Sequence, residues 1–170
     1  ITVSEAILGA TREIKLLDDS KVEIKIPAGT QSGTVLRVSG KGIRGDRFFD
    51  YKPDYKGQIT LFDWAVYERV RDEVVKGELD PKAFRRNVVL AGVDLNGLID
   101  KRFTLGGLEL TGSCECSPCY WMDQACAPGT HEFLKGYGGL RARIVKGGEL
   151  VTGDCELEIL AEVEPRSDDA

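Results

Sequence analysis

The sequence is poor in histidine and methionine, and it has fewer basic than acidic residues. His131 is the only histidine among 170 residues, and the net charge is -5. A negative balance disfavours a broad basic surface for nucleic acid, although a local basic pocket stays open. No apolar run approaches the ~18 residues that a membrane-spanning helix needs. We therefore expect a protein that binds neither nucleic acid nor membrane.

Several familiar motifs are also absent. Residues 1–20 show no signal-peptide pattern, because Glu5, Arg12 and Glu13 interrupt the apolar residues. We therefore expect a cytoplasmic protein whose thiols meet a reducing environment, where disulfides are uncommon. There is no serine nucleophile elbow, P-loop or dinucleotide-binding fingerprint.

What the sequence does have is a cluster of cysteines. Four of its five cysteines lie in one short run, at Cys114, Cys116, Cys119 and Cys126. A thiolate is both a nucleophile and a soft metal ligand. A structural zinc site usually takes its four ligands from two separated pairs, and a distant second pair is missing here. Cys126 and Cys155 are read more simply as small buried apolar residues.

Cys119 stands out within the cluster because it follows Pro118 and precedes Tyr120 and Trp121. A reactive thiolate needs positive charge nearby. A cysteine–histidine dyad would have to use His131, which suits a helix start after Pro128-Gly129-Thr130 equally well. The chain offers arginines at Arg44, Arg47, Arg85, Arg86, Arg141 and Arg143. They are either solvated surface residues or, beside the glycine-rich loops 42–45 and 138–139, a site for an anionic ligand.

Many short alternating segments separated by glycine predict a mainly β, barrel-like fold. One helix is expected at 64–76, with Asp63 as its N-cap and its aromatic residues packed in a core. The pairs Gly106-Gly107 and Gly147-Gly148 each predict a hairpin between the strands that flank them. The expected strands lie at 11–17, 21–26, 33–39, 58–62, 84–90, 102–105, 108–111, 140–145, 149–151 and 155–163.

Residues from about 38 to 160 carry a resemblance to a known family. The segments that match, in family order, are GKGIRGDRFFD at 40–50, GQITLF at 57–62, FRRNVV at 84–89, GVDLNGLI at 92–99, CSPCYWMD at 116–123, GGLRARI at 138–144 and GDCEL at 153–157. This part of the chain resembles a MOSC domain, the β-barrel found at the C-termini of molybdenum cofactor sulfurases and in related proteins.

The N-terminal residues carry a second resemblance. The segments ITVSEAILGATREI at 1–14 and VEIKIPAGTQSGTVLRVSGKGI at 22–43 are similar to the C-terminal peptide-binding domain of DnaJ-type co-chaperones. The chain thus looks like a join of two families, natural or engineered. We expect a DnaJ-like β segment at 1–43, a MOSC-like barrel at 44–163 and a polar tail at 164–170, with 1–163 packed as one unit. The DnaJ-like strands would then supply the first strands of the barrel.

The MOSC resemblance implies that the protein binds the molybdenum cofactor, an anionic pterin. By its place in the motif, Cys119 is implied as the catalytic residue and metal ligand, in sulfur transfer or a molybdenum-dependent reduction. The same motifs imply cofactor contacts for Arg47, Arg86, Asn87, Asp123, Arg141 and Arg143, with a helix-capping role as the alternative for Asp123. A redox partner protein is a further possible partner. The alternative functions are a module that binds unfolded peptide through its N-terminal segment, and a folded chimera without activity.

Overall fold

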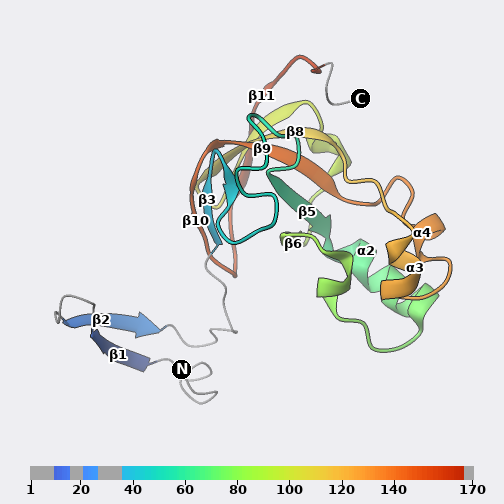
Figure 1. Cartoon of the computed structure of the whole chain (residues 1–170), viewed down its shortest axis with the longest axis horizontal. Helices are drawn as coiled ribbons and strands as arrows, with labels where there is room; N and C mark the ends of the chain where they lie inside the picture. The colour runs from blue at the N-terminus through green and yellow to red at the C-terminus, as the bar shows by residue number, and fades with distance from the viewer. Residues whose placement is uncertain (1–9, 16–20, 27–35, 167–170) are drawn as a thin grey trace. The chain divides into compact units, whose positions relative to one another are not determined.

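The computed structural model describes residues 10–15, 21–26 and 36–166, and the chain divides into two compact units (Figure 1). The smaller unit contains strands β1 and β2. The larger unit runs from Leu36 to Leu150 and resumes at Cys155. No helix in the described ranges is long and apolar enough to cross a membrane. The predicted cytoplasmic location and the predicted domain boundaries stay predictions.

The smaller unit is a two-stranded antiparallel sheet of β1 (Ala10–Lys15) and β2 (Lys21–Ile26). The two strands were predicted from sequence, and residues 16–17 of the first prediction lie outside the described residues. Among the described strands, each of these two pairs only with the other. The third predicted strand is present as β3 (Leu36–Ser39), and it pairs within the larger unit.

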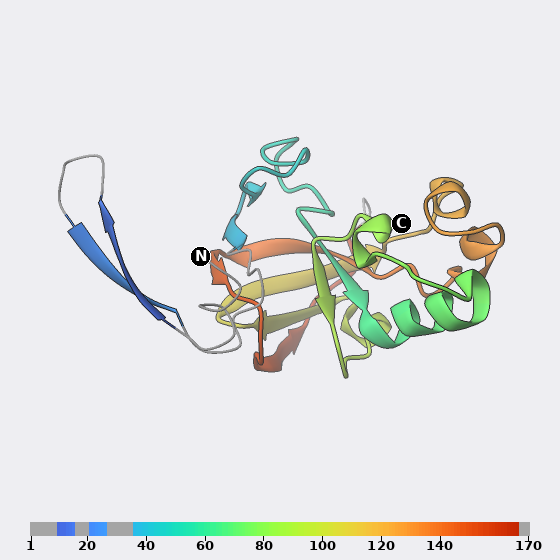
Figure 2. The same ribbon diagram turned by 90° about the horizontal axis from the view of Figure 1, so that it is seen from below.

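A curled six-stranded sheet forms the frame of the larger unit (Figure 2). Its order is β11-β7-β8-β9-β5-β6, and only the β5–β6 pair is parallel. The hairpin predicted at Gly106-Gly107 is confirmed, since both glycines have positive φ and Leu105 pairs with Leu108. The strands are β5 (Ile59–Asp63), β6 (Val88–Leu90), β7 (Lys101–Leu105), β8 (Leu108–Glu115), β9 (Leu140–Lys146) and β11 (Leu157–Glu162).

A three-stranded sheet in the order β10-β3-β4 adjoins this frame, with β4 at Gly42–Ile43 and β10 at Gly148–Leu150. The hairpin predicted at Gly147-Gly148 is wrong, because β10 pairs with β3 rather than with β9. Only Gly147 separates the end of β9 at Lys146 from the start of β10 at Gly148, and neither glycine has the positive φ that a two-residue hairpin turn requires. The chain therefore continues past β9 instead of folding back on it.

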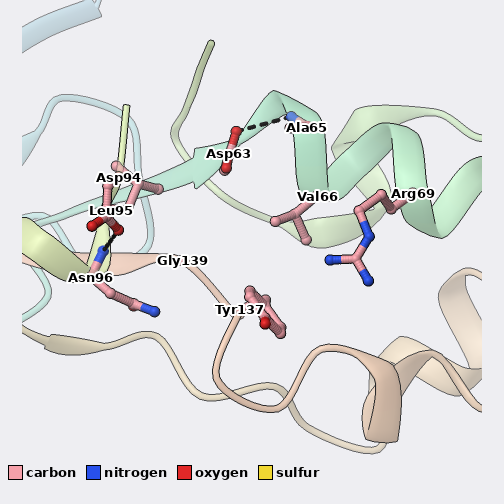
Figure 3. Close-up of a pocket in the computed structure, with 9 residues that line it drawn as sticks. All are labelled: Asp63, Ala65, Val66, Arg69, Asp94, Leu95, Asn96, Tyr137 and Gly139. Carbon is pink, nitrogen blue, oxygen red and sulfur yellow. Dashed lines mark hydrogen bonds between the residues drawn. The ribbon is translucent and has the colours of Figure 1, made fainter. Parts of the chain in front are cut away.

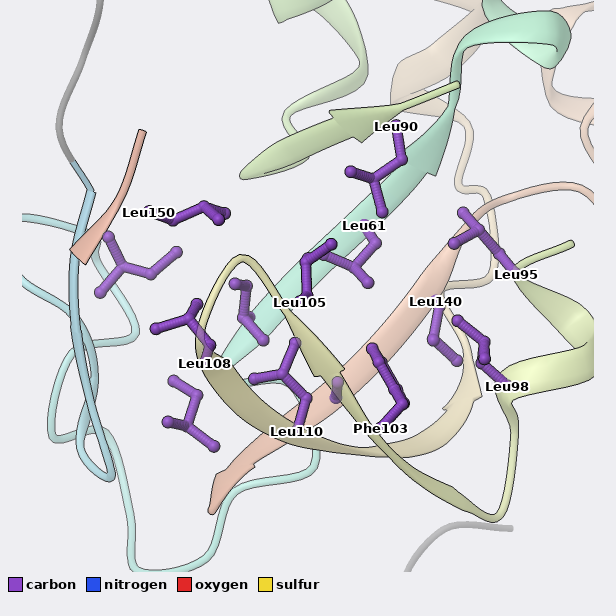
Figure 4. Close-up of a cluster of buried hydrophobic side chains, with 14 residues drawn as sticks. Leu61, Leu90, Leu95, Leu98, Phe103, Leu105, Leu108, Leu110, Leu140 and Leu150 are labelled. Atoms are coloured by element: carbon purple, nitrogen blue, oxygen red, sulfur yellow. The ribbon is translucent and has the colours of Figure 1, made fainter. Parts of the chain in front are cut away.

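Two apolar clusters hold the larger unit together. The first fills the curve of the sheet and is made mostly of leucines from alternate positions of β5, β7, β8 and β9 (Figure 4). The second packs Phe62 of β5 against the helices through Tyr67, Phe84, Met122 and Leu134. Strand β5 thus contributes to both clusters, which leaves Thr60 between them facing a cavity.

All the helical segments except η3, which lies against β7 and β8, gather at one end of the six-stranded sheet (Figures 1 and 2). The predicted helix begins after Asp63, whose side chain accepts a hydrogen bond from the Ala65 amide, and it continues as a π-helical segment to Val75. Tyr67 and Val70 are buried as predicted, whereas Trp64 is 38% exposed. The segments are α2 (Trp64–Arg69), η1 (Val70–Val75), η2 (Pro81–Phe84), η3 (Asn96–Leu98), α3 (Trp121–Ala125) and α4 (Thr130–Phe133).

Candidate cofactor pocket

A cavity of about 560 Å³ opens where the loop after β4, the start of β6 and the cysteine loop after β8 meet. Its volume lies in the ~300–1,000 Å³ range of small-molecule sites. The residues that line it are Gly45, Asp46, Arg47, Phe48, Tyr55, Gly57, Thr60, Arg85, Arg86, Asn87, Cys116, Ser117, Cys119 and Arg141. Five of the residues predicted for the site, Cys119, Arg47, Arg86, Asn87 and Arg141, are therefore brought together.

Cys119 is the exposed thiol of this cavity. It ends an irregular loop, and its carbonyl accepts a hydrogen bond from the Met122 amide at the start of α3. His131 belongs to α4, where its ring lies 4.7 Å from the ring of Tyr120, and it does not line the cavity. Among the described residues no group of three or more cysteine, histidine or acidic side chains could hold a metal ion. The structure thus presents Cys119 as a single accessible sulfur beside arginines.

Arg86 fixes the position of the cysteine loop. Its guanidinium donates to the carbonyl of Cys116 at 2.8 Å, and to the carbonyls of Gly138 and Phe84 at 2.9 Å each. Burial lowers the pKa of Arg86 from its usual value, with the charges of neighbouring groups acting in both directions. Because three of its donors are used by backbone carbonyls, Arg86 contributes mainly geometry and positive potential to the pocket.

Asn87 has a similar role at the other side of the cavity. Its side-chain oxygen accepts from the amide and the hydroxyl of Thr60, and its side-chain nitrogen donates to Asp46 at 3.0 Å. Asn87 thereby ties β6 to β5 and to the loop after β4. A direct contact of Asn87 with a ligand would compete with these bonds.

The arginines that remain give the cavity its charge. Arg47 lies 4.5 Å from the ring of Phe48, and Arg85 lies 6.0 Å from the ring of Trp121. Burial acts to lower the pKa of Arg141, but a side-chain hydrogen bond with Cys116 and nearby negative groups outweigh it and raise that pKa. In the described part of the chain none of these three arginines has a carboxylate partner. Positive charge is thus concentrated in this cavity, although the net charge of the chain is -5.

Two predicted site residues lie elsewhere. The carboxylate of Asp123 accepts a hydrogen bond from the His131 amide at 2.7 Å, which is the helix-capping alternative. Arg143 is 5% exposed and lines a different cavity of about 320 Å³, where it donates to Ser113 and to the Asp54 carbonyl. Neither side chain lines the Cys119 pocket.

Sequence reasoning did not assign Arg85, Cys116, Tyr55 or Thr60 to the site, and all four line it. A signal was available for two of them. Arg85 stands next to Arg86 in the sequence and is one of the arginines named above as a possible site for an anionic ligand. Cys116 stands three residues before Cys119. Tyr55 and Thr60 carry no such local signal, because only the folding of the loop after β4 onto β5 places them here.

A smaller cavity of about 210 Å³ lies beside α2 (Figure 3). Its charged groups are used within the fold: Asp63 caps α2, and Asp94 accepts from the Asn96 amide. Arg69 pairs with Glu73 and lies over the ring of Tyr137, which Figure 3 shows across from α2. This cavity contains no thiol or histidine, so the Cys119 pocket is the stronger candidate.

The curled sheet is of β-barrel type and carries a basic pocket that contains a thiol, and sequence comparison identifies the family. Residues 32–156 match the MOSC domain family. This match covers most of the chain, which therefore belongs to the MOSC family. Solved structures with a similar fold include the YUAD protein of Bacillus subtilis, at a TM-score of 0.64 and 18% identity over 81% of this chain and 87% of that one. YiiM of Escherichia coli aligns at a TM-score of 0.59 and 18% identity, over 86% of this chain and 69% of that one.

The N-terminal part has different relatives. Residues 1–60 match the DnaJ C terminal domain family. The chaperone protein DnaJ of Pelagibacter ubique is 49% identical over 79 residues, which are 42% of this chain and 21% of that protein. DnaJ of Treponema denticola is 46% identical over 84 residues, which are 46% of this chain and 22% of that protein. The matched part thus spans about a fifth of these chaperones. The predicted combination of a MOSC domain with a DnaJ-like segment is confirmed.

Proposed function

We propose that the pocket binds the molybdenum cofactor and that Cys119 is the thiolate that ligates molybdenum or carries a transferred sulfur. The observation that carries this proposal is the placement of one exposed thiol in a cavity lined by arginines without carboxylate partners. The MOSC family is associated with this cofactor. The reaction class is sulfur transfer or a molybdenum-dependent reduction, and a reduction requires electrons from a redox partner protein.

The residues present fit such a ligand. A soft thiolate is a suitable ligand for a soft or intermediate metal centre. Guanidinium groups bind phosphate oxygens with charge-assisted hydrogen bonds, and Arg47, Arg85 and Arg141 have donors available for that purpose. The rings of Phe48 and Tyr55 lie 5.5 Å apart and provide an aromatic wall for a flat pterin. When bound, the cofactor supplies a metal centre that can exchange electrons and accept sulfur.

Arg86 and Asn87 act on this site indirectly. By holding the carbonyls of Cys116 and Gly138, Arg86 fixes the loop from which the Cys119 thiol extends. Asn87 fixes the opposite wall through Thr60 and Asp46. A thiolate that is held in place loses less conformational entropy on ligation than one on a mobile loop.

The test is the molybdenum and pterin content of protein purified from a cofactor-producing host. We expect stoichiometric molybdenum in the wild type, loss of molybdenum in Cys119→Ser, and full retention in Cys155→Ser, which removes the other exposed thiol. Equal molybdenum in Cys119→Ser and wild type would exclude the ligand role. A wild-type protein that melts cooperatively but carries neither molybdenum nor pterin would exclude the whole proposal.

A second candidate function is the binding of an unfolded peptide by the N-terminal segment. It is supported by the match of residues 1–60 to the DnaJ C terminal domain. Extended peptides add to exposed sheet edges through backbone hydrogen bonds. We expect suppression of the aggregation of a denatured client, and no effect at several-fold molar excess would exclude this function.

A further inference from the structure

Two cysteines, rather than one, line the proposed cofactor pocket. Cys116 and Cys119 both contribute to its wall, with Ser117 and Pro118 between them. This is the Cys-x-x-Cys spacing, at which two thiols can join in a small disulfide-bonded ring. Residues 116–119 belong to no helix or strand, and the backbone hydrogen bonds of the two cysteines are the Cys116 amide to the Gly139 carbonyl and the Met122 amide to the Cys119 carbonyl.

The two thiols differ in accessibility. Cys119 is exposed, whereas Cys116 is only 5% exposed. In thiol–disulfide exchange the accessible thiolate attacks first, and a shielded neighbour then attacks the mixed disulfide. The exposure of the pair therefore matches an attacking and a resolving cysteine.

The surroundings of Cys116 support the second role. Arg141 lines the same cavity as Cys116, and Arg86 donates to the Cys116 carbonyl at 2.8 Å. The form of a cysteine that attacks a disulfide is the thiolate, which carries a negative charge. The two guanidinium groups thus place positive charge beside the shielded sulfur.

Cys116 is also held firmly in place. Its amide donates to the Gly139 carbonyl at 2.7 Å. A Cβ at Gly138 would lie 2.3 Å from the Cys116 carbonyl oxygen, so only glycine allows this close approach. With Cys116 anchored, formation of a ring requires movement only at the exposed Cys119 end of the loop.

We propose that Cys116 and Cys119 form a reversible disulfide, which makes the pocket a thiol–disulfide exchange site for small-molecule disulfides of the glutathione class. The Cys119 thiolate attacks one sulfur of the small disulfide, forming a mixed disulfide and releasing one thiolate. The Cys116 thiolate then attacks the Cys119 sulfur, forming the internal disulfide and releasing the second thiolate. The protein dithiol is oxidised by two electrons, and the small disulfide is reduced to two thiols. This activity needs no molybdenum, and its product withdraws Cys119 from any metal.

The other cysteines provide controls within the chain. Burial, followed by the charge of Asp123, raises the pKa of Cys126. Cys155 is exposed but does not line the pocket. A parent variant with Cys114, Cys126 and Cys155 changed to alanine therefore keeps only the two pocket thiols.

The experiment incubates this parent in glutathione buffers of increasing oxidised fraction, alkylates the free thiols and measures the intact mass. We expect only two species, a doubly alkylated dithiol and an unalkylated form lighter than the reduced protein by two hydrogen atoms. Adding Cys116→Ser should trap one glutathione on Cys119. Adding Cys119→Ser should leave the protein without an adduct over the time in which the parent reacts.

A parent that accumulates the same stable glutathione adduct as its Cys116→Ser variant would overturn the proposal. So would a parent that stays doubly alkylated in fully oxidised glutathione. If the parent does not melt cooperatively, the wild type is treated in the same way instead. Fragmentation of its peptide with the four clustered cysteines then shows which two cysteines are joined by the disulfide. Because the readout is mass, the result is independent of cofactor binding.

Discussion

Two arginines of β9, only two residues apart, border two different cavities and do different things there. Arg143 is buried and satisfied: it donates to the Ser113 hydroxyl at 2.9 Å and pairs with Asp54 at 3.4 Å. Arg141 lines the Cys119 pocket and has no carboxylate partner in the described ranges. A guanidinium whose hydrogen-bond donors are used by acceptors within the fold has a structural role. A guanidinium whose donors are not used in this way can bind an anionic ligand.

Arg141 and Arg143 have different surroundings because of a bulge in β8. Gly112 pairs with Ala142 and Cys114 pairs with Arg141, so Ser113 is an extra residue in β8. A bulge re-aims side chains locally, and here it brings the Ser113 hydroxyl to Arg143. Gly112 is required next to it, because a Cβ there would lie 2.0 Å from the Leu98 carbonyl oxygen.

The largest effect is expected from removing the residue that holds the pocket together. Arg86→Met keeps a similar length but leaves the carbonyls of Phe84, Cys116 and Gly138 without their donors. Each hydrogen bond to a charged donor contributes about 1.5–3 kcal/mol, and for three such bonds we expect a combined loss of about 5 kcal/mol in the free energy of unfolding. Urea denaturation followed by tryptophan fluorescence measures it. A loss below ~1 kcal/mol would show that water replaces the guanidinium without cost.

A smaller loss of stability is expected at the structural arginine of β9. In Arg143→Met the buried Ser113 hydroxyl loses its partner, while Asp54, which is half exposed, regains water. We expect a loss of about 2 kcal/mol in the free energy of unfolding. Binding of inorganic pyrophosphate to the Cys119 pocket, measured by calorimetry at low salt, should be unchanged. Weaker pyrophosphate binding would contradict the separation of the two cavities.

Arg141→Met is the matched variant of Arg143→Met. It should change the stability little and weaken the binding of pyrophosphate. Its stability should change by less than ~1 kcal/mol, because no carboxylate is left unpaired. Its pyrophosphate affinity should fall by about tenfold, which is the effect of one charge-assisted hydrogen bond. The affinity of the wild type should also fall as salt is raised, since the site is open to solvent.

The same contrast shows what could be read from the sequence. The strands, the Asp63 cap and the gathering of Cys119 with Arg47, Arg86 and Arg141 followed from local patterns and family motifs. Local patterns treated Arg141 and Arg143 alike, because the β8 bulge that separates them depends on pairing between strands. The hairpin predicted at Gly147-Gly148 failed because neither glycine adopts a positive φ and β10 pairs with β3, a pairing that no local pattern encodes. Local patterns in the sequence do not show which strands pair with one another or which acceptors each arginine side chain meets.

The smallest effect concerns the alkylation rate of Cys126, the last of the four clustered cysteines. Only thiolates are alkylated, and burial, followed by the charge of Asp123, raises the pKa of Cys126. At neutral pH less Cys126 is therefore ionised than an ordinary thiol, and its alkylation rate should keep rising with pH beyond the usual range of a thiol. Peptide mapping after iodoacetamide pulses from pH 7 to 10 gives the profile for each cysteine.

Asp123→Asn sharpens this last comparison. The asparagine side-chain oxygen can still accept from the His131 amide, so the cap of α4 is kept while the negative charge is removed. The pKa of Cys126 should then fall toward its usual value, and its alkylation rate near pH 8 should rise. The pKa of a thiol falls by one unit for each ~1.4 kcal/mol of unfavourable interaction removed, so the change reports the contribution of Asp123 alone. An unchanged profile would assign the whole shift to burial.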